Sequence, residues 1–135
     1  MSVHRLPTSI PWRSLFWSAL ALITFVALMP WTQELPKPFQ WSDKLNHFAA
    51  FVVLVWSLKA AYPLKNRQAW LWMLAYGAAI ESIQYFLPWR SAEWADLAVD
   101  ALAALTGLLL YPFFERSVIC LWDIMPSYKK HQQGK

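Results

Sequence analysis

The sequence has little charge and little cysteine. Only 15% of its 135 residues are charged and 58% are hydrophobic, whereas an ordinary soluble domain is about 25% charged and about 45–50% apolar. This shortage of charge is typical of membrane proteins. The one cysteine, Cys120, excludes an internal disulfide, and we expect it to be a small buried apolar residue.

Several functional motifs are also missing. The sequence contains no HExxH or comparable metal-ligand motif, no serine nucleophile elbow and no phosphate loop. Its acids and a histidine could still bind a divalent cation, but no motif supports a metal site, and the sequence names no cofactor. The formal net charge is +4, but the basic residues are not clustered with base-stacking aromatics. No nucleic-acid partner is expected, and the positions of these residues suit a membrane better.

Four apolar segments predict an all-α, polytopic membrane protein with a bundle of four transmembrane helices, since a bilayer core needs about 20 residues per helix. They cover residues 15–29, 44–62, 68–87 and 95–112. No clear small-x-small cleavage site follows Met29, which favours a retained first helix over a signal peptide. Beyond residue 112 the pattern predicts an interfacial amphipathic helix. Its apolar face is formed by Phe114, Val118, Leu121, Trp122 and Met125.

Loop charge predicts the orientation. Most lysines and arginines fall at the two termini and between the second and third segments, and most acids fall on the other side. The positive-inside rule therefore places both termini in the cytoplasm of a bacterial inner-membrane protein. The predicted division is a cytoplasmic segment (1–13), a four-helix transmembrane domain (14–112), and a cytoplasmic interfacial helix with a basic tail (113–135). Most tryptophans lie near predicted helix ends, where the ring can be buried and the indole N–H hydrated.

With this topology, the polar residues gather in one layer near the outer ends of three helices. Helical spacing places Asp43 with His47, Glu81 with Gln84, and Asp96 with Asp100 on shared faces. Small residues continue these faces and let helices approach in lipid. We therefore expect the polar faces to point into the bundle and to form a cavity open to the outer side. Its predicted lining is His47, Glu81, Gln84, Arg90, Asp96 and Asp100.

The candidates differ in how easily a structural role explains them. A charge inside a spanning helix costs at least about 2.5–3.5 kcal/mol, so Glu81, Asp96 and Asp100 favour a functional reading over a structural polar network. The other candidates have ordinary alternatives, namely helix capping, an interfacial position, packing, an ion pair or an interhelical hydrogen bond. These alternatives apply to Asp43, Lys44, His47, Gln84 and Arg90.

Two kinds of chemistry are available to this layer. His47 beside Asp43 or Asp96 could relay a proton, and Glu81 with Asp100 could share one in a low-dielectric site. The predicted catalytic residues are His47, Glu81, Asp96 and Asp100. Arg90 can grip a phosphate or a carboxylate with two hydrogen bonds. The predicted ligand-binding residues are Asp43, Lys44, Gln84 and Arg90.

Two stretches resemble the VanZ-like family of small bacterial membrane proteins: DKLNHFAAFVVL (43–54) and GAAIESIQYFLPWRSAEWADLAVDALAALTG (77–107). The family pattern is Asp-Lys-x-x-His, a helix ending Glu-x-x-Gln, a Pro/Arg turn, and Asp-x-x-x-Asn-x-x-Gly-x-x-x-Gly. The matching residues are Asp43, Lys44, His47, Glu81, Gln84, Pro88, Arg90, Asp96 and Gly107. Asp100 replaces the family's Asn and Ala103 its usual Gly, so this chain carries an additional acid.

The resemblance implies a link to glycopeptide resistance, because the founding member is associated with resistance to teicoplanin, but it implies no established reaction. Our first hypothesis is that the cavity binds or acts on the headgroup of a membrane lipid, such as a polyprenyl-phosphate-linked envelope precursor. Two alternatives stay open: a non-enzymatic subunit or scaffold of an envelope complex, and a small proton- or cation-coupled carrier within a homo-oligomer. The sequence leaves open whether any reaction is catalysed.

Overall fold

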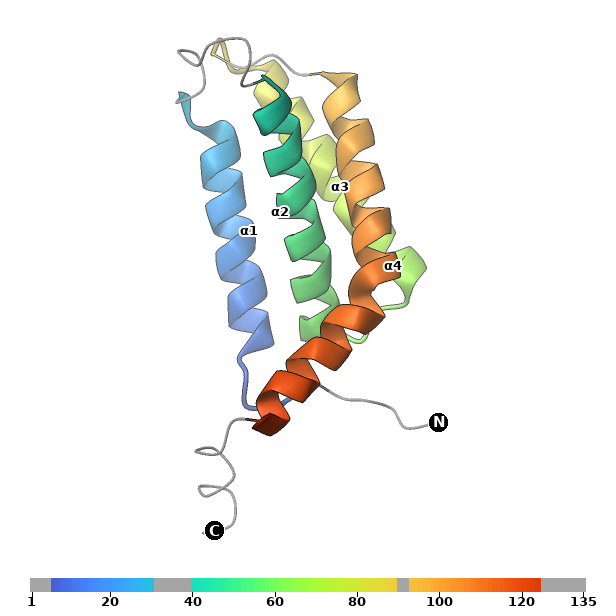
Figure 1. The fold of residues 1–135 in the computed structure, drawn as a ribbon. Helices are drawn as coiled ribbons and strands as arrows, with labels where there is room; N and C mark the ends of the chain where they lie inside the picture. Colours follow the sequence, from blue (N-terminus) through green and yellow to red (C-terminus); the bar gives the residue numbers. More distant parts are fainter. Residues whose placement is uncertain (1–5, 31–39, 90–92, 125–135) are drawn as a thin grey trace.

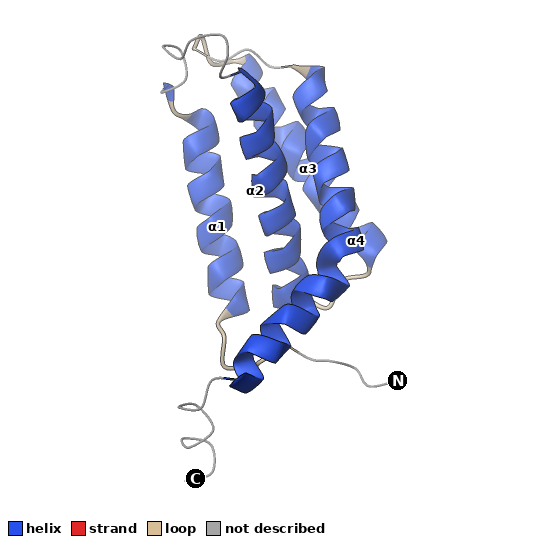
Figure 2. Cartoon of the chain, viewed as in Figure 1, coloured by secondary structure: helices blue, strands red, loops and turns tan. Residues whose placement is uncertain are grey.

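The computed structural model describes residues 6–30, 40–89 and 93–124, which form four α-helices and no strand (Figures 1 and 2). The helices are α1 (Trp12–Leu28), α2 (Gln40–Ala61), α3 (Asn66–Tyr85) and α4 (Trp94–Ile124). Successive helices alternate in direction (Figure 1). The end of α1, the start of α2, the end of α3 and the start of α4 therefore lie at the same end of the bundle. The all-α prediction is confirmed.

Local sequence sets the ends of α3. Gln68 accepts a hydrogen bond from the backbone N–H of Lys65 at 3.0 Å, which satisfies a donor that the first turn leaves free. At the other end, the backbone N–H of Phe86 bonds the carbonyl of Ile83 at 3.1 Å, and Pro88 follows, where a helix cannot easily continue. The predicted segment 68–87 thus corresponds closely to α3.

The core lies where α2 packs against α4 and α3. It is built largely from Phe51, Leu54, Val55, Met73, Ala103, Ala104 and Leu108. Gly107 on α4 lets the two backbones approach. A Cβ at this position would contact the Cγ1 atom of Val55 and lie 3.3 Å from the Cα of Val52. The indole N–H of Trp56 donates to the Gly107 carbonyl at 2.7 Å, which ties α2 to α4 at the same level.

The chain does not break at Pro112. We predicted a fourth span ending there and a separate interfacial helix after it, but α4 is one continuous helix with Pro112 inside it. Figure 1 shows α4 changing direction partway along, after which it runs across the foot of the bundle. Proline explains the bend, because it removes a backbone hydrogen bond and its ring clashes with the preceding turn. Phe114 then stacks on Trp56 and contacts Trp12. Cys120, expected to be buried, is exposed on this segment.

The four predicted membrane spans are not all confirmed. Among the described helices, α4 alone is long and apolar enough to cross a membrane, and α1 is apolar but shorter. Charged residues inside α2 and α3 lower their apolar character. Large apolar side chains are nevertheless exposed on all four helices, including Leu22, Val53, Trp72 and Leu109. Extensive exposed apolar surface marks sites of protein or membrane contact.

Several tryptophans use their indole N–H differently from our expectation that it would be hydrated. Trp70 donates to the carbonyl of Ala101 on α4 at 3.2 Å, and Trp12 donates to Pro7 at 3.1 Å. Trp89 donates to the carbonyl of Leu28 at 3.2 Å. These indoles therefore join chain segments to one another.

Candidate functional site

The polar candidates lie together at one end of the bundle, where α2 and α4 begin and α3 ends. We call this the polar end, and its described residues are Lys44, His47, Glu81, Glu93, Asp96 and Asp100. They come from α2, α3 and the start of α4 with the residue before it. All but Glu81 fall in two levels along the α2–α4 interface. The sequence predicted a single layer that also held Asp43 and Arg90, and the outward orientation of that layer stays a prediction.

The first level is a cluster around Lys44. Its ammonium lies 2.7 Å from Oδ1 of Asp96 and 3.2 Å from Oε2 of Glu93. Both acids come from the start of α4, where negative charge also interacts favourably with the helix dipole. Because Lys44 is 36% exposed and Glu93 55% exposed, solvent weakens these ion pairs. The cluster can exchange partners more easily than a buried ion pair could.

The second level is the pair formed by His47 and Asp100. Nδ1 of His47 lies 3.4 Å from Oδ1 of Asp100, and the Asp100 side chain is only 1% exposed. On the α3 side, a Cβ at Gly77 would lie 3.1 Å from Oδ2 of the same carboxylate. The glycine therefore leaves room for Asp100 between α2 and α3. We had placed His47 beside Asp43 or Asp96. The structure describes a contact with Asp100, one turn farther along α4 than Asp96, whereas the Asp43 side chain lies outside the described residues, so that pairing stays a prediction.

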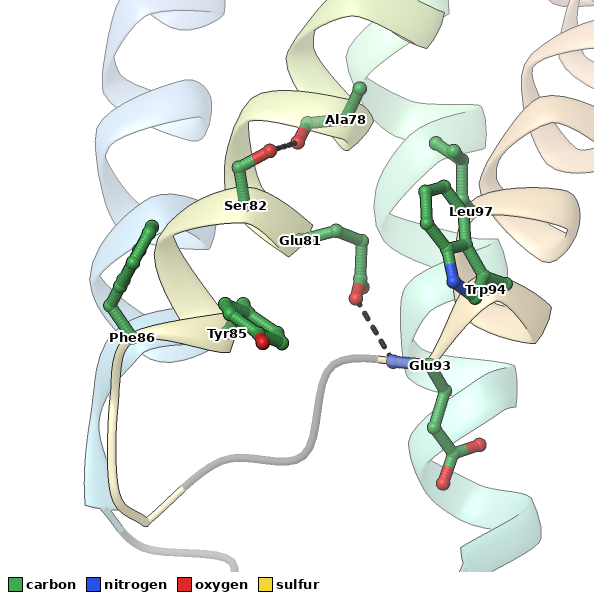
Figure 3. A pocket seen from close by; sticks show the side chains of 8 residues that line it. All are labelled: Ala78, Glu81, Ser82, Tyr85, Phe86, Glu93, Trp94 and Leu97. Carbon is green, nitrogen blue, oxygen red and sulfur yellow. Dashed lines mark hydrogen bonds between the residues drawn. The ribbon is translucent and has the colours of Figure 1, made fainter.

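Glu81 lies apart from these two levels and lines a pocket of about 440 Å³ between the end of α3 and the start of α4 (Figure 3). Its Oε2 accepts a hydrogen bond from the backbone N–H of Glu93 at 3.2 Å. Its Oε1 is buried and has no hydrogen-bond partner among the described residues. The rest of the pocket lining is Ala78, Ser82, Tyr85, Phe86, Glu93, Trp94 and Leu97. Glu81 is thus a carboxylate in mainly apolar surroundings.

Gln84 has a structural role that the sequence left open. It is buried, and its amide donates to the carbonyl of Ala27 at 2.9 Å. Ala27 is near the C-terminus of α1, where the last carbonyls lack partners within the helix. Gln84 and Trp89 together satisfy two of these carbonyls. The amide therefore joins α3 to α1, and it does not line the Glu81 pocket.

The described members of the predicted cavity lining fall in more than one place. Of the five predicted residues that the structure describes, Glu81 alone lines the pocket. His47, Asp96 and Asp100 are engaged between α2 and α4. Arg90 and the side chain of Asp43 lie outside the described residues, so their predicted roles stay predictions. Among the residues described, no three His, Cys, Asp or Glu side chains form a group that could hold a metal ion.

Glu93 is a residue of the site that is not among the sequence-predicted candidates. Its carboxylate pairs with Lys44, and its backbone N–H donates a hydrogen bond to Glu81. It thereby links α2 and α3 through the start of α4. The spacing of Glu93 and Asp96, three residues apart at a helix start, was the available signal, because such residues share a helix face.

Comparison with known proteins settles the family. A family model described as VanZ/LLP1 matches residues 4–115, which include all four helices up to the bend in α4 and every residue of the polar end. The chain belongs to the VanZ/LLP1 family. No curated protein and no solved structure matches it significantly. The resemblance identified from the two sequence stretches is confirmed.

Membership of the VanZ/LLP1 family strengthens the interpretation of the exposed apolar surface as a membrane-contacting surface. The family assignment and the long apolar α4 both support a membrane association. Asp100 also becomes more informative, because it stands where the resemblance places Asn. In this chain the position carries a buried acidic side chain.

Proposed function

We propose that this VanZ/LLP1 protein is a multi-pass protein of the bacterial inner membrane whose polar end faces outward. There it binds the headgroup of a lipid-linked cell-envelope amphiphile. The apolar sides of α1 to α4 would contact acyl chains, while the polar end would lie at headgroup level. The observation that carries the proposal is the segregation of six ionisable residues at one end of a helix bundle with exposed apolar sides.

The Lys44 cluster is the proposed contact for a phosphate. Lys44 is the one lysine or arginine that the described residues place at the polar end, and two carboxylates hold its ammonium. A phosphate would displace Glu93, the more exposed partner, and Arg90 would supply the second cation. A polyprenyl-phosphate-linked precursor fits this requirement, because its single chain would lie along the apolar helices. This exchange is favourable only if the headgroup also satisfies the released acid.

The His47–Asp100 pair would act beneath the bound headgroup. Asp100 is too deeply buried to contact a ligand directly, so we assign it the task of orienting His47. His47 could then transfer a proton to or from the headgroup, as histidine does near neutral pH. In this scheme His47 is the candidate acid–base group and Asp100 is a positioning residue.

Native mass spectrometry of the purified protein tests the proposal. We expect the wild type to retain a lipid-linked envelope species and an Arg90→Ala/Glu81→Ala double variant to lose most of it. An Arg67→Ala/Asp123→Ala double variant is the matched control, since it removes one cation and one acid remote from the polar end. Identical retained lipid in the wild type and the first variant would refute the proposal. A stoichiometric protein partner in place of lipid would favour the accessory-subunit alternative.

The implied link to glycopeptide resistance gives a second readout. If the polar end binds a cell-wall precursor, expression of the protein should change the susceptibility of a sensitive strain to teicoplanin. The Arg90→Ala/Glu81→Ala variant should lose this effect, and the control variant should keep it. Equal susceptibility with and without the wild-type protein would mean that the protein has no role in teicoplanin resistance. The lipid-binding proposal would then stand without it.

A further inference from the structure

The pocket beside Glu81 has a chemical character different from that of the Lys44 cluster. Its lining contains two carboxylates and, among the described residues, no lysine, arginine or histidine. Figure 3 shows the Glu81 side chain between Tyr85 and Phe86 on one side and Trp94 and Leu97 on the other. The described lining therefore combines two acids with apolar, partly aromatic walls. These groups favour a cation that carries apolar groups.

The unpartnered oxygen of Glu81 specifies what the cation must offer. Oε2 already accepts the Glu93 N–H, whereas Oε1 is buried with no described donor. Leaving a carboxylate oxygen buried and unbonded is costly. A primary ammonium group would donate a charge-assisted hydrogen bond to it and neutralise the charge. A quaternary ammonium has no N–H and could not satisfy this oxygen.

The walls indicate that the ammonium belongs to a lipid. Tyr85, Phe86 and Trp94 are 75%, 81% and 88% exposed, and they stand on the outer surface of α3 and α4. A small hydrophilic amine would leave these rings uncovered, whereas an amphiphile would cover them with its glycerol and acyl groups. Aromatic rings also attract cations through their π-faces. We propose that the Glu81 pocket binds the primary ammonium of a lipid headgroup.

This inference rests on the proposed headgroup-level position of the polar end and names a second chemistry for it. The Lys44 cluster would take a phosphate, and the Glu81 pocket would take an amine. Both groups occur together in a zwitterionic aminophospholipid, and an amine also occurs on some lipid-linked precursors. The shared feature is the primary ammonium, so the experiment varies that group.

The test places the full-length protein in nanodiscs of defined lipid and measures retained lipid by native mass spectrometry. We expect the wild type to retain phosphatidylethanolamine over phosphatidylglycerol and over phosphatidylcholine, which lacks N–H donors. Glu81→Gln keeps the size and the acceptor for the Glu93 N–H but removes the charge. It should weaken phosphatidylethanolamine retention about tenfold, the scale of one charge-assisted hydrogen bond.

Two further variants complete the design. Trp94→Leu keeps an apolar wall without the ring and should reduce retention about two- to fivefold, in line with an exposed cation–π contact. Asp123→Asn, at the far end of α4, should change nothing. Equal retention of the three lipids by the wild type, or an unchanged preference in Glu81→Gln, would overturn the inference. If the protein shows no preference for the amine lipid but still retains a lipid-linked envelope species, the inference fails and the proposed function stands. If it prefers the amine lipid but retains no lipid-linked envelope species, the proposed function fails and the inference stands.

Discussion

The α2–α4 interface has two halves, one formed by ionisable residues and one by glycine and apolar residues. Near the start of α4 it contains the Lys44 cluster and the His47–Asp100 pair. Two turns farther along, Gly107 packs directly on Val52 and Val55, and Trp56 bonds the Gly107 carbonyl. The apolar half fixes how closely the helices approach, because Gly107 has no side chain and the backbone of α4 lies directly against α2. The polar half then uses that spacing to bring ionisable groups from two helices into contact.

We expect the apolar half of the α2–α4 interface to contribute more to the stability of the fold than the polar half. Gly107→Val should cause the largest loss, about 3 kcal/mol, because added carbons would meet both a side chain and the backbone of α2. Thermal unfolding in mild detergent measures it. Valine is a better helix former than glycine, so helix propensity alone would raise the stability. Any measured loss of stability can therefore be attributed to the clash.

A matched control is available two residues along the same helix. Leu109 is exposed, and Leu109→Val introduces the same residue where nothing packs closely. It should change stability only slightly. If Gly107→Val were as stable as this control, the helices would not be in the close contact described here, and the contrast between the two halves would disappear.

The inner polar pair should have the next largest effect. Asp100→Ala removes the carboxylate next to His47 and leaves a space beside Gly77, at a cost of about 1–3 kcal/mol. Asp100→Asn keeps the shape and an acceptor oxygen and should cost less. Comparing their unfolding temperatures with their lipid retention separates packing from chemistry. Normal stability and impaired retention in Asp100→Asn would show that the charge has a functional task, whereas equal losses in both variants would make the charge itself structural.

The exposed Lys44 cluster should contribute least to stability. Lys44→Met keeps the apolar stem and removes the ammonium, and we expect a loss of under about 1 kcal/mol that shrinks further at high salt. Retention of phosphate-bearing lipid should nevertheless fall. A large, salt-independent loss of stability would mean that the cluster is structural, which would undermine its assignment as a phosphate contact.

Much of this arrangement could be predicted from the sequence. Apolar segments of suitable length gave the four helices, and the i, i+4 spacing of Asp96 and Asp100 placed both acids toward α2. The family pattern was recognisable from the spacing of its residues. Those residues fall near three helix ends, which the fold brings together. Periodicity carries this information, since it fixes which residues share a face.

Other features depend on tertiary contacts that one sequence does not encode locally. The contact of His47 with Asp100 is one such feature, because it depends on how α2 and α4 are placed along each other. Pro112 was read as the end of a helix, although a proline can also bend one when neighbouring packing holds both sides. For Gln84 the sequence left open a cavity position or an interhelical hydrogen bond, and only the position of α1 shows that its partner is the carbonyl of Ala27.

Site-directed cysteine labelling tests most directly the central claim that the polar end lies at the outer surface of the membrane. In a Cys120→Ser background, Ala95→Cys places a thiol at an exposed position in the first turn of α4, and Arg67→Cys places one at the opposite end of the bundle. If the polar end faces outward, a membrane-impermeant maleimide should label Ala95→Cys in intact cells and Arg67→Cys only after permeabilisation. Labelling of Arg67→Cys in intact cells, with Ala95→Cys protected, would contradict this orientation.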